Sequence, residues 1–104
     1  MIIVTIDHIP GRNYEVLGVV KGNVVQSKNF GKDFMSAMKG LVGGEIVAYT
    51  EMLAEARQIA TGRMAKEAEA LGADAVLNLR YASSSVMQSA AECIAYGTAV
   101  HFVD

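Results

Sequence analysis

Several residue types are scarce in this chain, and each shortage excludes a class of protein. Its 104 residues include one cysteine, one proline and no tryptophan. The single cysteine, Cys93, cannot form an internal disulfide and fits a reducing compartment. No apolar run approaches the ~18 residues of a membrane span, and the first residues lack the basic flank of a signal peptide. We therefore expect a cytoplasmic protein that has no membrane partner.

Charge is also scarce, whereas apolar residues are abundant. Charged residues make up 19% of the chain, the net charge is -2, and the nine lysines and arginines are scattered singly. Nucleic acid is therefore not an expected partner. The apolar fraction is 52% without glycine, above the usual ~45–50% that includes it. In a single small domain spanning residues 1–104, this excess indicates burial against further copies of the same chain.

Two kinds of periodicity occur in the sequence: alternation of side-chain type, typical of strands, and a spacing of three to four residues, typical of a helix. Together they predict an α+β fold, a small mixed or antiparallel sheet packed on one long helix. The residues at 82–85 read as a flexible polar loop between the last two strands. Gly22-Asn23 fits either a tight turn or a bulge, and the pattern does not choose between them. The predicted strands cover residues 2–5, 14–27, 74–81 and 90–103.

The long helix is predicted over residues 45–71. Gly43-Gly44 should separate it from an earlier helical pattern over 29–42, and Gly72 is placed as its C-terminal cap. At ~1.5 Å per residue the helix is roughly 40 Å long, whereas a compact chain of this length has a radius of gyration of ~13 Å. Its length favours packing between subunits. Its apolar stripe is Ile46, Tyr49, Leu53, Ala56, Ala60, Met64 and Leu71.

The last predicted strand is apolar on both faces. One face carries small residues from Ala91 to Ala99, and the other carries bulky residues from Ile94 to Phe102. A half-solvated antiparallel strand alternates apolar with polar residues. We therefore expect this strand to be buried on both sides, by the helix on one side and by a neighbouring subunit on the other.

Stretches across nearly the whole chain resemble the YbjQ-like family, whose label is "putative heavy-metal-binding". The resemblance implies a dodecin-subunit type of fold and a ring of five subunits. It also implies metal binding, without a defined activity. The matching stretches are Gly18-Val19-Val20-Lys21-Gly22, Val42-Gly43-Gly44-Glu45, Tyr49, Ala56-Arg57, Ala60, Met64, Leu71-Gly72-Ala73-Asp74-Ala75-Val76 and Gly97-Thr98-Ala99-Val100.

Metal ligands are few, so a divalent metal ion is a cofactor hypothesis that rests on symmetry. Cys93 and His101 share a strand face, but eight residues at ~3.3 Å place them roughly 26 Å apart. They cannot hold one ion within a subunit. One histidine per subunit around a ring axis could build a site. Otherwise Cys93 is a core thiol, and His101 and His8 are surface histidines.

Further candidate residues lie on the long helix. Gly43-Gly44-Glu45 resembles a minimal anion nest, but Glu45 would repel an anion and no nucleotide motif follows, so a helix start or a close approach of the backbone is the favoured explanation. Glu51 and Glu55 repel each other one turn apart, which implies a partner. The residues most open to a ligand or interface role are Gly43, Gly44, Glu45, Tyr49, Glu51, Arg57 and Arg63.

No nucleophile–base pair is visible in the sequence. We interpret the chain as a non-enzymatic homo-oligomer, pentameric by resemblance, that binds a metal ion or small ligand at subunit junctions. Three alternatives stay open. One is a dodecin-like small-molecule binder, although the tryptophan that dodecins use to stack flavin is missing. The others are an enzyme with a composite site between subunits and a purely structural assembly module.

Overall fold

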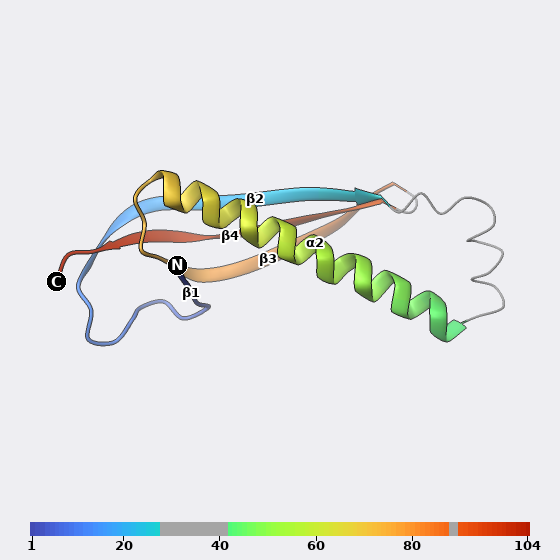
Figure 1. The fold of residues 1–104 in the computed structure, drawn as a ribbon, viewed down its shortest axis with the longest axis horizontal. Helices are drawn as coiled ribbons and strands as arrows, with labels where there is room; N and C mark the ends of the chain where they lie inside the picture. The colour runs from blue at the N-terminus through green and yellow to red at the C-terminus, as the bar shows by residue number, and fades with distance from the viewer. Residues whose placement is uncertain (28–41, 88–89) are drawn as a thin grey trace.

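The computed structural model of the chain describes residues 1–27, 42–87 and 90–104, with side chains of the helix described from residue 50 onward. Four strands form one sheet in the order β1-β3-β4-β2, in which β1 runs parallel to β3 and the other pairs are antiparallel. One helix packs on this sheet (Figure 1). The predicted α+β class is confirmed. The elements are β1 (Ile2–Ile3), β2 (Tyr14–Ser27), α2 (Val42–Ala70), β3 (Ala75–Met87) and β4 (Ala90–Phe102).

Strand β3 is longer than the sequence predicted. The polar loop expected over 82–85 is wrong, because Ser83 pairs with Cys93 and Ser85 pairs with Ala91 in the β3–β4 ladder. Strand β4 offers backbone partners along its whole length, and this pairing overrides the weak strand preference of serine. The segment also contains no glycine or proline, the residues that most strongly interrupt a strand.

Gly22 forms neither of the two features that the sequence left open. Strand β2 runs unbroken through it, and the bulge lies earlier, between Val16 and Gly18, where Gly18 has a φ of 137°. A Cβ at Gly22 would collide with the backbone of Ala60 and Met64 on the helix. Gly22 therefore lets α2 cross the sheet at close range.

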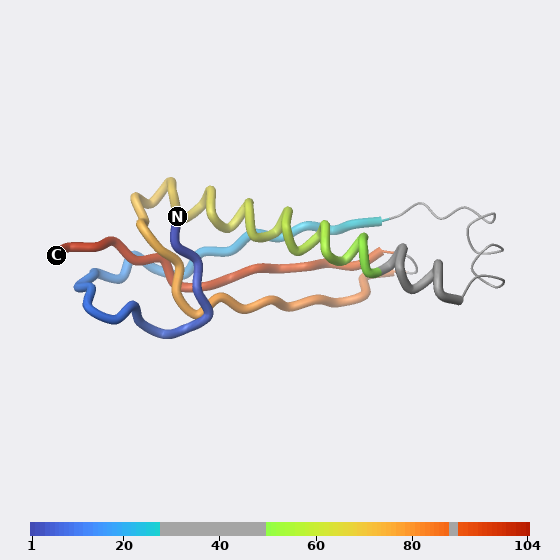
Figure 2. Tube along the Cα trace, turned by 60° about the horizontal axis from the view of Figure 1, so that its bottom comes forward, coloured from blue at the N-terminus to red at the C-terminus, as the bar shows by residue number. Residues whose placement is uncertain are grey.

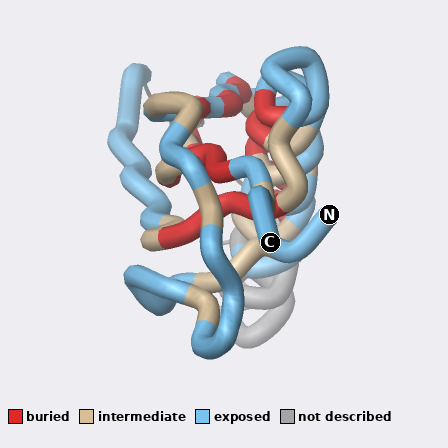
Figure 3. The backbone as a smooth tube through the Cα atoms, turned by 90° about the vertical axis from the view of Figure 1, so that its left-hand side faces the viewer, coloured by how far each residue is buried: buried red, intermediate tan, exposed pale blue. Residues whose placement is uncertain are grey.

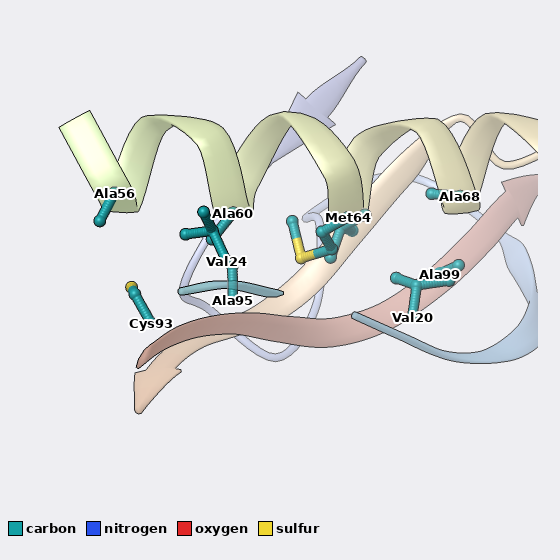
Figure 4. Packing of buried hydrophobic residues seen from close by; sticks show 10 residues of the cluster. Val20, Val24, Ala56, Ala60, Met64, Ala68, Cys93, Ala95 and Ala99 are labelled. Atoms are coloured by element: carbon teal, nitrogen blue, oxygen red, sulfur yellow. The ribbon is translucent and has the colours of Figure 1, made fainter. Parts of the chain in front are cut away.

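Helix α2 packs through a row of small or flexible side chains spaced four residues apart. The predicted stripe is confirmed at Ala56, Ala60 and Met64. It is wrong at Leu71, which lies past the last helical residue and is half exposed. The buried row is Met52, Ala56, Ala60, Met64 and Ala68, of which the last four face Val20, Val24, Cys93, Ala95 and Ala99 (Figure 4).

The two ends of α2 differ in how well the sequence predicted them. The helix begins at Val42, so the predicted break at Gly43-Gly44 is wrong and both glycines lie in its first turn. The helical pattern expected over 29–41 lies outside the described residues. At the other end the prediction is confirmed. Gly72 has a φ of 80°, its N–H donates to the Glu69 carbonyl (2.9 Å), and the Ala73 N–H donates to the Ala68 carbonyl (3.0 Å), which is a Schellman cap.

The second face of β4 is covered at one end only. There the segment between β1 and β2 closes over the sheet, and Val4 and Ile9 pack on a small cluster around Val100. Towards the other end, Ile94 is half buried and Tyr96 is exposed. Within one chain, β4 is thus buried on both faces only near Val100, where the chain's own segment covers it; the neighbouring subunit expected over the rest of the second face stays a prediction. Figure 3 shows that the buried residues lie mainly between the helix and the sheet, whereas the outer sides of the molecule carry exposed residues.

The molecule is elongated, with extents of 58 × 22 × 17 Å and a radius of gyration of 17.4 Å, against ~13 Å for a compact chain. The long helix runs beside strands of 13 and 14 residues (Figure 2). Because the sheet is itself long, the length of the helix does not by itself require a second subunit. Among the described residues, no helix is long and apolar enough to cross a membrane.

Candidate functional site

A groove of about 500 Å³ opens between α2 and the helix-side face of β3. The helix crosses mainly β2 and β4, so β3 is left largely uncovered on this side (Figure 1). Among the residues lining the groove, Arg57 carries the only charge. The lining is Ala54, Arg57, Gln58, Thr61, Gly62 and Tyr81.

A chain of two hydrogen bonds ties the helix wall of the groove to the strand wall. Thr61 Oγ1 donates to the carbonyl of Arg57 (2.7 Å) and lies 2.8 Å from the Tyr81 hydroxyl. Threonine has one hydroxyl proton, and at Thr61 this proton is used in the hydrogen bond to the Arg57 carbonyl. Tyr81 is therefore the donor in the second bond, and its oxygen keeps lone pairs free to accept a further hydrogen bond.

Gly62 lies in the interior of α2, where glycine is an unfavourable residue. It destabilises an exposed helix by about 1 kcal/mol relative to alanine. A Cβ at this position would meet nothing within 4 Å among the described residues, so their packing does not demand glycine. The missing side chain leaves the groove wall bare.

The opposite flank of α2 is closed against the edge of β2. The Arg63 guanidinium donates to the Asn23 carbonyl (2.7 Å), and the Glu67 carboxylate accepts from the Lys21 N–H (3.3 Å). These two side chains occupy backbone groups at the sheet edge that a further strand would otherwise use.

The structure thus separates the helix residues that the sequence singled out. Arg57 lines the groove, Arg63 lies on the other flank, and Glu51 is exposed. The sequence missed Thr61 and Tyr81, which come from two elements that only the fold brings together. The one local indication was a glycine inside a helix. Of the other candidates, Gly43, Gly44, Glu45 and Tyr49 lie in the first turns of α2, where side-chain surroundings are outside the described residues.

The two metal candidates lie at different places on β4. Cys93 is buried against the helix, which confirms its interpretation as a core thiol. His101 is exposed, and its Nδ1 lies 2.8 Å from Asp74 Oδ2, which also accepts the Phe102 N–H (2.8 Å). Within the described parts of the chain, no group of three or more side chains is arranged to hold a metal ion.

The N- and C-terminal segments are joined near this histidine by Arg12. Its guanidinium donates to Asp104 (3.0 Å) and lies 3.8 Å from the centroid of the Phe102 ring. The hydrogen bond from Arg12 holds the pKa of Asp104 below its ordinary value of 3.8. The contact fixes the chain end to the segment that covers the second face of the sheet.

Comparison with known proteins places the chain in a family. The model of the YbjQ family, described as "Putative heavy-metal-binding", matches residues 1–103. The chain belongs to this family. A UPF0145 protein of Clostridium novyi is 61% identical over 100 residues, covering 96% of this chain and 97% of that protein. A UPF0145 protein of Thermotoga maritima is 62% identical over 101 residues, covering 96% and 95%. The resemblance drawn from the sequence is confirmed.

A solved structure supports the fold of this YbjQ family member. A protein of unknown function from Pediococcus pentosaceus, assigned to the DUF74 family, superposes with a TM-score of 0.65 at 18% identity. The match covers 99% of this chain and 98% of that one. At this identity the likeness shows the fold alone.

Proposed function

We propose that the protein is a non-enzymatic homo-oligomer, a closed ring of five subunits that holds a small ligand or a divalent metal ion at its subunit junctions. The observation that carries the proposal is an apolar area on the face of the sheet turned away from α2. Val19 is 72% exposed, Val25 is 55% exposed and Tyr96 is 40% exposed. The strand register places all three on this face, in line with Thr98, Glu92 and Lys21 respectively.

A second copy of the chain is the cover that best fits this face. Exposed apolar side chains interspersed with charged ones on one face are a feature of interfaces between subunits. The two relatives are covered over 95–97% of their own length, so in those proteins no further domain is present to cover the face. Lys21, Arg80 and Glu92 lie on the same face and supply charges of both signs for pairing across a contact. Subunits that meet head-to-tail close into a ring when the rotation permits.

A metal ion at the junction is supported by the pair Asp74 and His101. Asp74 Oδ2 lies 2.8 Å from Nδ1 of the imidazole, and in the tautomer that carries its proton on Nδ1, the lone pair of Nε2 is available to a metal. A carboxylate–histidine pair of this kind is the usual support of a metal-bound histidine. A ring would bring one His101 from each subunit.

Native mass spectrometry of untreated protein, with light scattering at micromolar concentration, tests the assembly. We expect a mass about five times 11.1 kDa. The double variant Val19→Glu/Val25→Glu should dissociate the oligomer into folded monomers, because it would bury two charges at the contact. Val103→Glu is the matched control, since Val103 is equally exposed but lies past the end of β4. A wild-type monomer, or a double variant that keeps the full mass, would contradict the proposal.

Zinc titration by calorimetry tests the metal part separately. We expect fewer than one Zn²⁺ per subunit, lost in His101→Gln and retained in His8→Gln. Cys93→Ala should leave binding unchanged, because the thiol is enclosed by the core. One tight ion per subunit that is abolished by Cys93→Ala would refute the placement at His101.

A further inference from the structure

We propose that the groove between α2 and β3 binds a small planar organic anion that carries a carboxylate at one end and a hydrogen-bond donor at the other. The site lies within one subunit, so it does not depend on the proposed ring. Its polar groups are Arg57, Gln58, Thr61 and Tyr81.

The charge of the ligand follows from Arg57. A guanidinium pairs with a carboxylate through two parallel hydrogen bonds. Arg57 has no acidic residue three or four positions away along the helix (Leu53, Ala54, Ala60 and Thr61 stand there). Its side chain makes no ion pair with the part of the chain that the structure describes. Among the described residues no carboxylate neutralises this guanidinium, and an anion from outside could do so.

The donor on the ligand follows from Tyr81. Its hydroxyl proton is committed to Thr61, whose own proton is committed to the Arg57 carbonyl. The Tyr81 oxygen can then only accept, and a ligand that lies beside it needs an O–H or N–H. Arg57 thus requires a carboxylate and Tyr81 requires a hydrogen-bond donor, and these two requirements fix the orientation of the ligand in the groove.

The planar body of the ligand follows from Gly62. Glycine in a helix interior is unfavourable unless something uses the space, and the space at Gly62 is empty. Gly62 thus leaves a bare spot on the helix wall that Tyr81 faces, with Gln58 one turn before it and Ala54 about two turns before it. A flat ring can lie against this wall. The groove holds about 500 Å³ and is open to solvent along one side, so one face of a bound ring would stay in water.

The test uses 3- and 4-hydroxybenzoate as probes, which set the donor at two distances from the carboxylate. Binding is followed by ¹H–¹⁵N spectra of the full chain, with Gly62 and Thr61 as reporters. We expect one of the two probes to shift these amides saturably. Benzoate, which lacks the donor, and 4-hydroxybenzamide, which lacks the charge, should each bind at least about tenfold more weakly.

Three variants locate the site. Arg57→Gln should weaken binding of the better probe at least about tenfold, and Gly62→Leu should abolish it by filling the groove. Lys66→Gln removes the same charge from an exposed position on another side of the helix and should retain full affinity. Equal binding by Arg57→Gln, or saturable shifts only outside the groove, would overturn the proposal.

The oligomeric masses of the same variants show whether the ligand proposal and the ring proposal fail together or separately. If Gly62→Leu dissociates the oligomer, the groove is a contact for a neighbouring subunit, and the ligand proposal is refuted while assembly is supported. If the oligomer persists but neither probe binds, the ligand proposal fails alone. Saturable binding by a wild-type monomer would support the groove and refute the ring.

Discussion

The two ends of the sheet are built from the same three long strands, yet they are covered differently. At the end near Val100, α2 lies on one face, and the segment that carries Val4 and Ile9 lies on the other. At the end near Val25, α2 covers one face and the described residues leave the other bare. The sequence of β4 is largely apolar on both faces from Cys93 to Val100, and Glu92 interrupts the second face beside Val25. The apolar pattern of β4 therefore indicates that both faces are buried, and only the fold shows whether the same chain buries them.

The largest effect is expected where helix and sheet cross between these ends. Gly22→Val would place a side chain against the backbone of Ala60 and Met64, which cannot move aside without lifting α2. We expect a loss of about 3 kcal/mol or more in the free energy of unfolding, measured by urea denaturation. Gly62→Ala is the contrasting change, because the space there is open; it should stabilise the protein by about 0.5–1 kcal/mol. Equal effects at the two glycines would contradict the close crossing.

A matched pair of valine truncations compares the two ends directly. Val100 is fully buried and Val25 is mostly exposed. In a Val19→Glu background, which carries one of the two charges of the dissociating double variant and which we also expect to be monomeric, Val100→Ala should cost about 2 kcal/mol. Val25→Ala in the same background should stay within about 0.5 kcal/mol of the parent. A large loss at Val25 in a monomer would mean that the chain itself covers this end.

The helix cap near the doubly covered end gives a smaller effect. Gly72 has a φ of 80°, a conformation in which a β-branched side chain is strained. Gly72→Val should lower the free energy of unfolding by about 1–2 kcal/mol, seen as a lower melting temperature by circular dichroism. Gly72→Asn, which tolerates this conformation better, should lose less. Identical losses would show that the strain at this residue is not the cause.

The smallest effect concerns Asp104 at the same end. Its pKa is held below 3.8 by the hydrogen bond from Arg12. Because the folded pKa is depressed, the contribution of this group is present above the unfolded pKa and is lost as the pH falls through the folded pKa. A ¹³C titration of the carboxyl should give a midpoint below 3.8, and Arg12→Gln should move it upward. An unchanged midpoint in Arg12→Gln would show that the ion pair is absent in solution.

Local chemistry explains what the sequence could predict. The cap at Gly72 and the row Ala56, Ala60 and Met64 depend on neighbours within one helix, so periodicity and residue type were enough. The strand over 82–85 depends on backbone partners in β4, which no local pattern records. The groove depends on Tyr81 meeting Thr61 from another element. Gly22 is the intermediate case, because a glycine was visible but its cause, the crossing helix, was not.

The central claim is that copies of the chain meet on the bare end of the sheet. An isotope-filtered NOE experiment tests it most directly, in a mixture of subunits labelled at valine methyl groups and unlabelled subunits. We predict contacts between subunits from the methyl groups of Val19 and Val25, and none from Val103. A sample without any contact between subunits at Val19 and Val25 would contradict the account, whatever its mass.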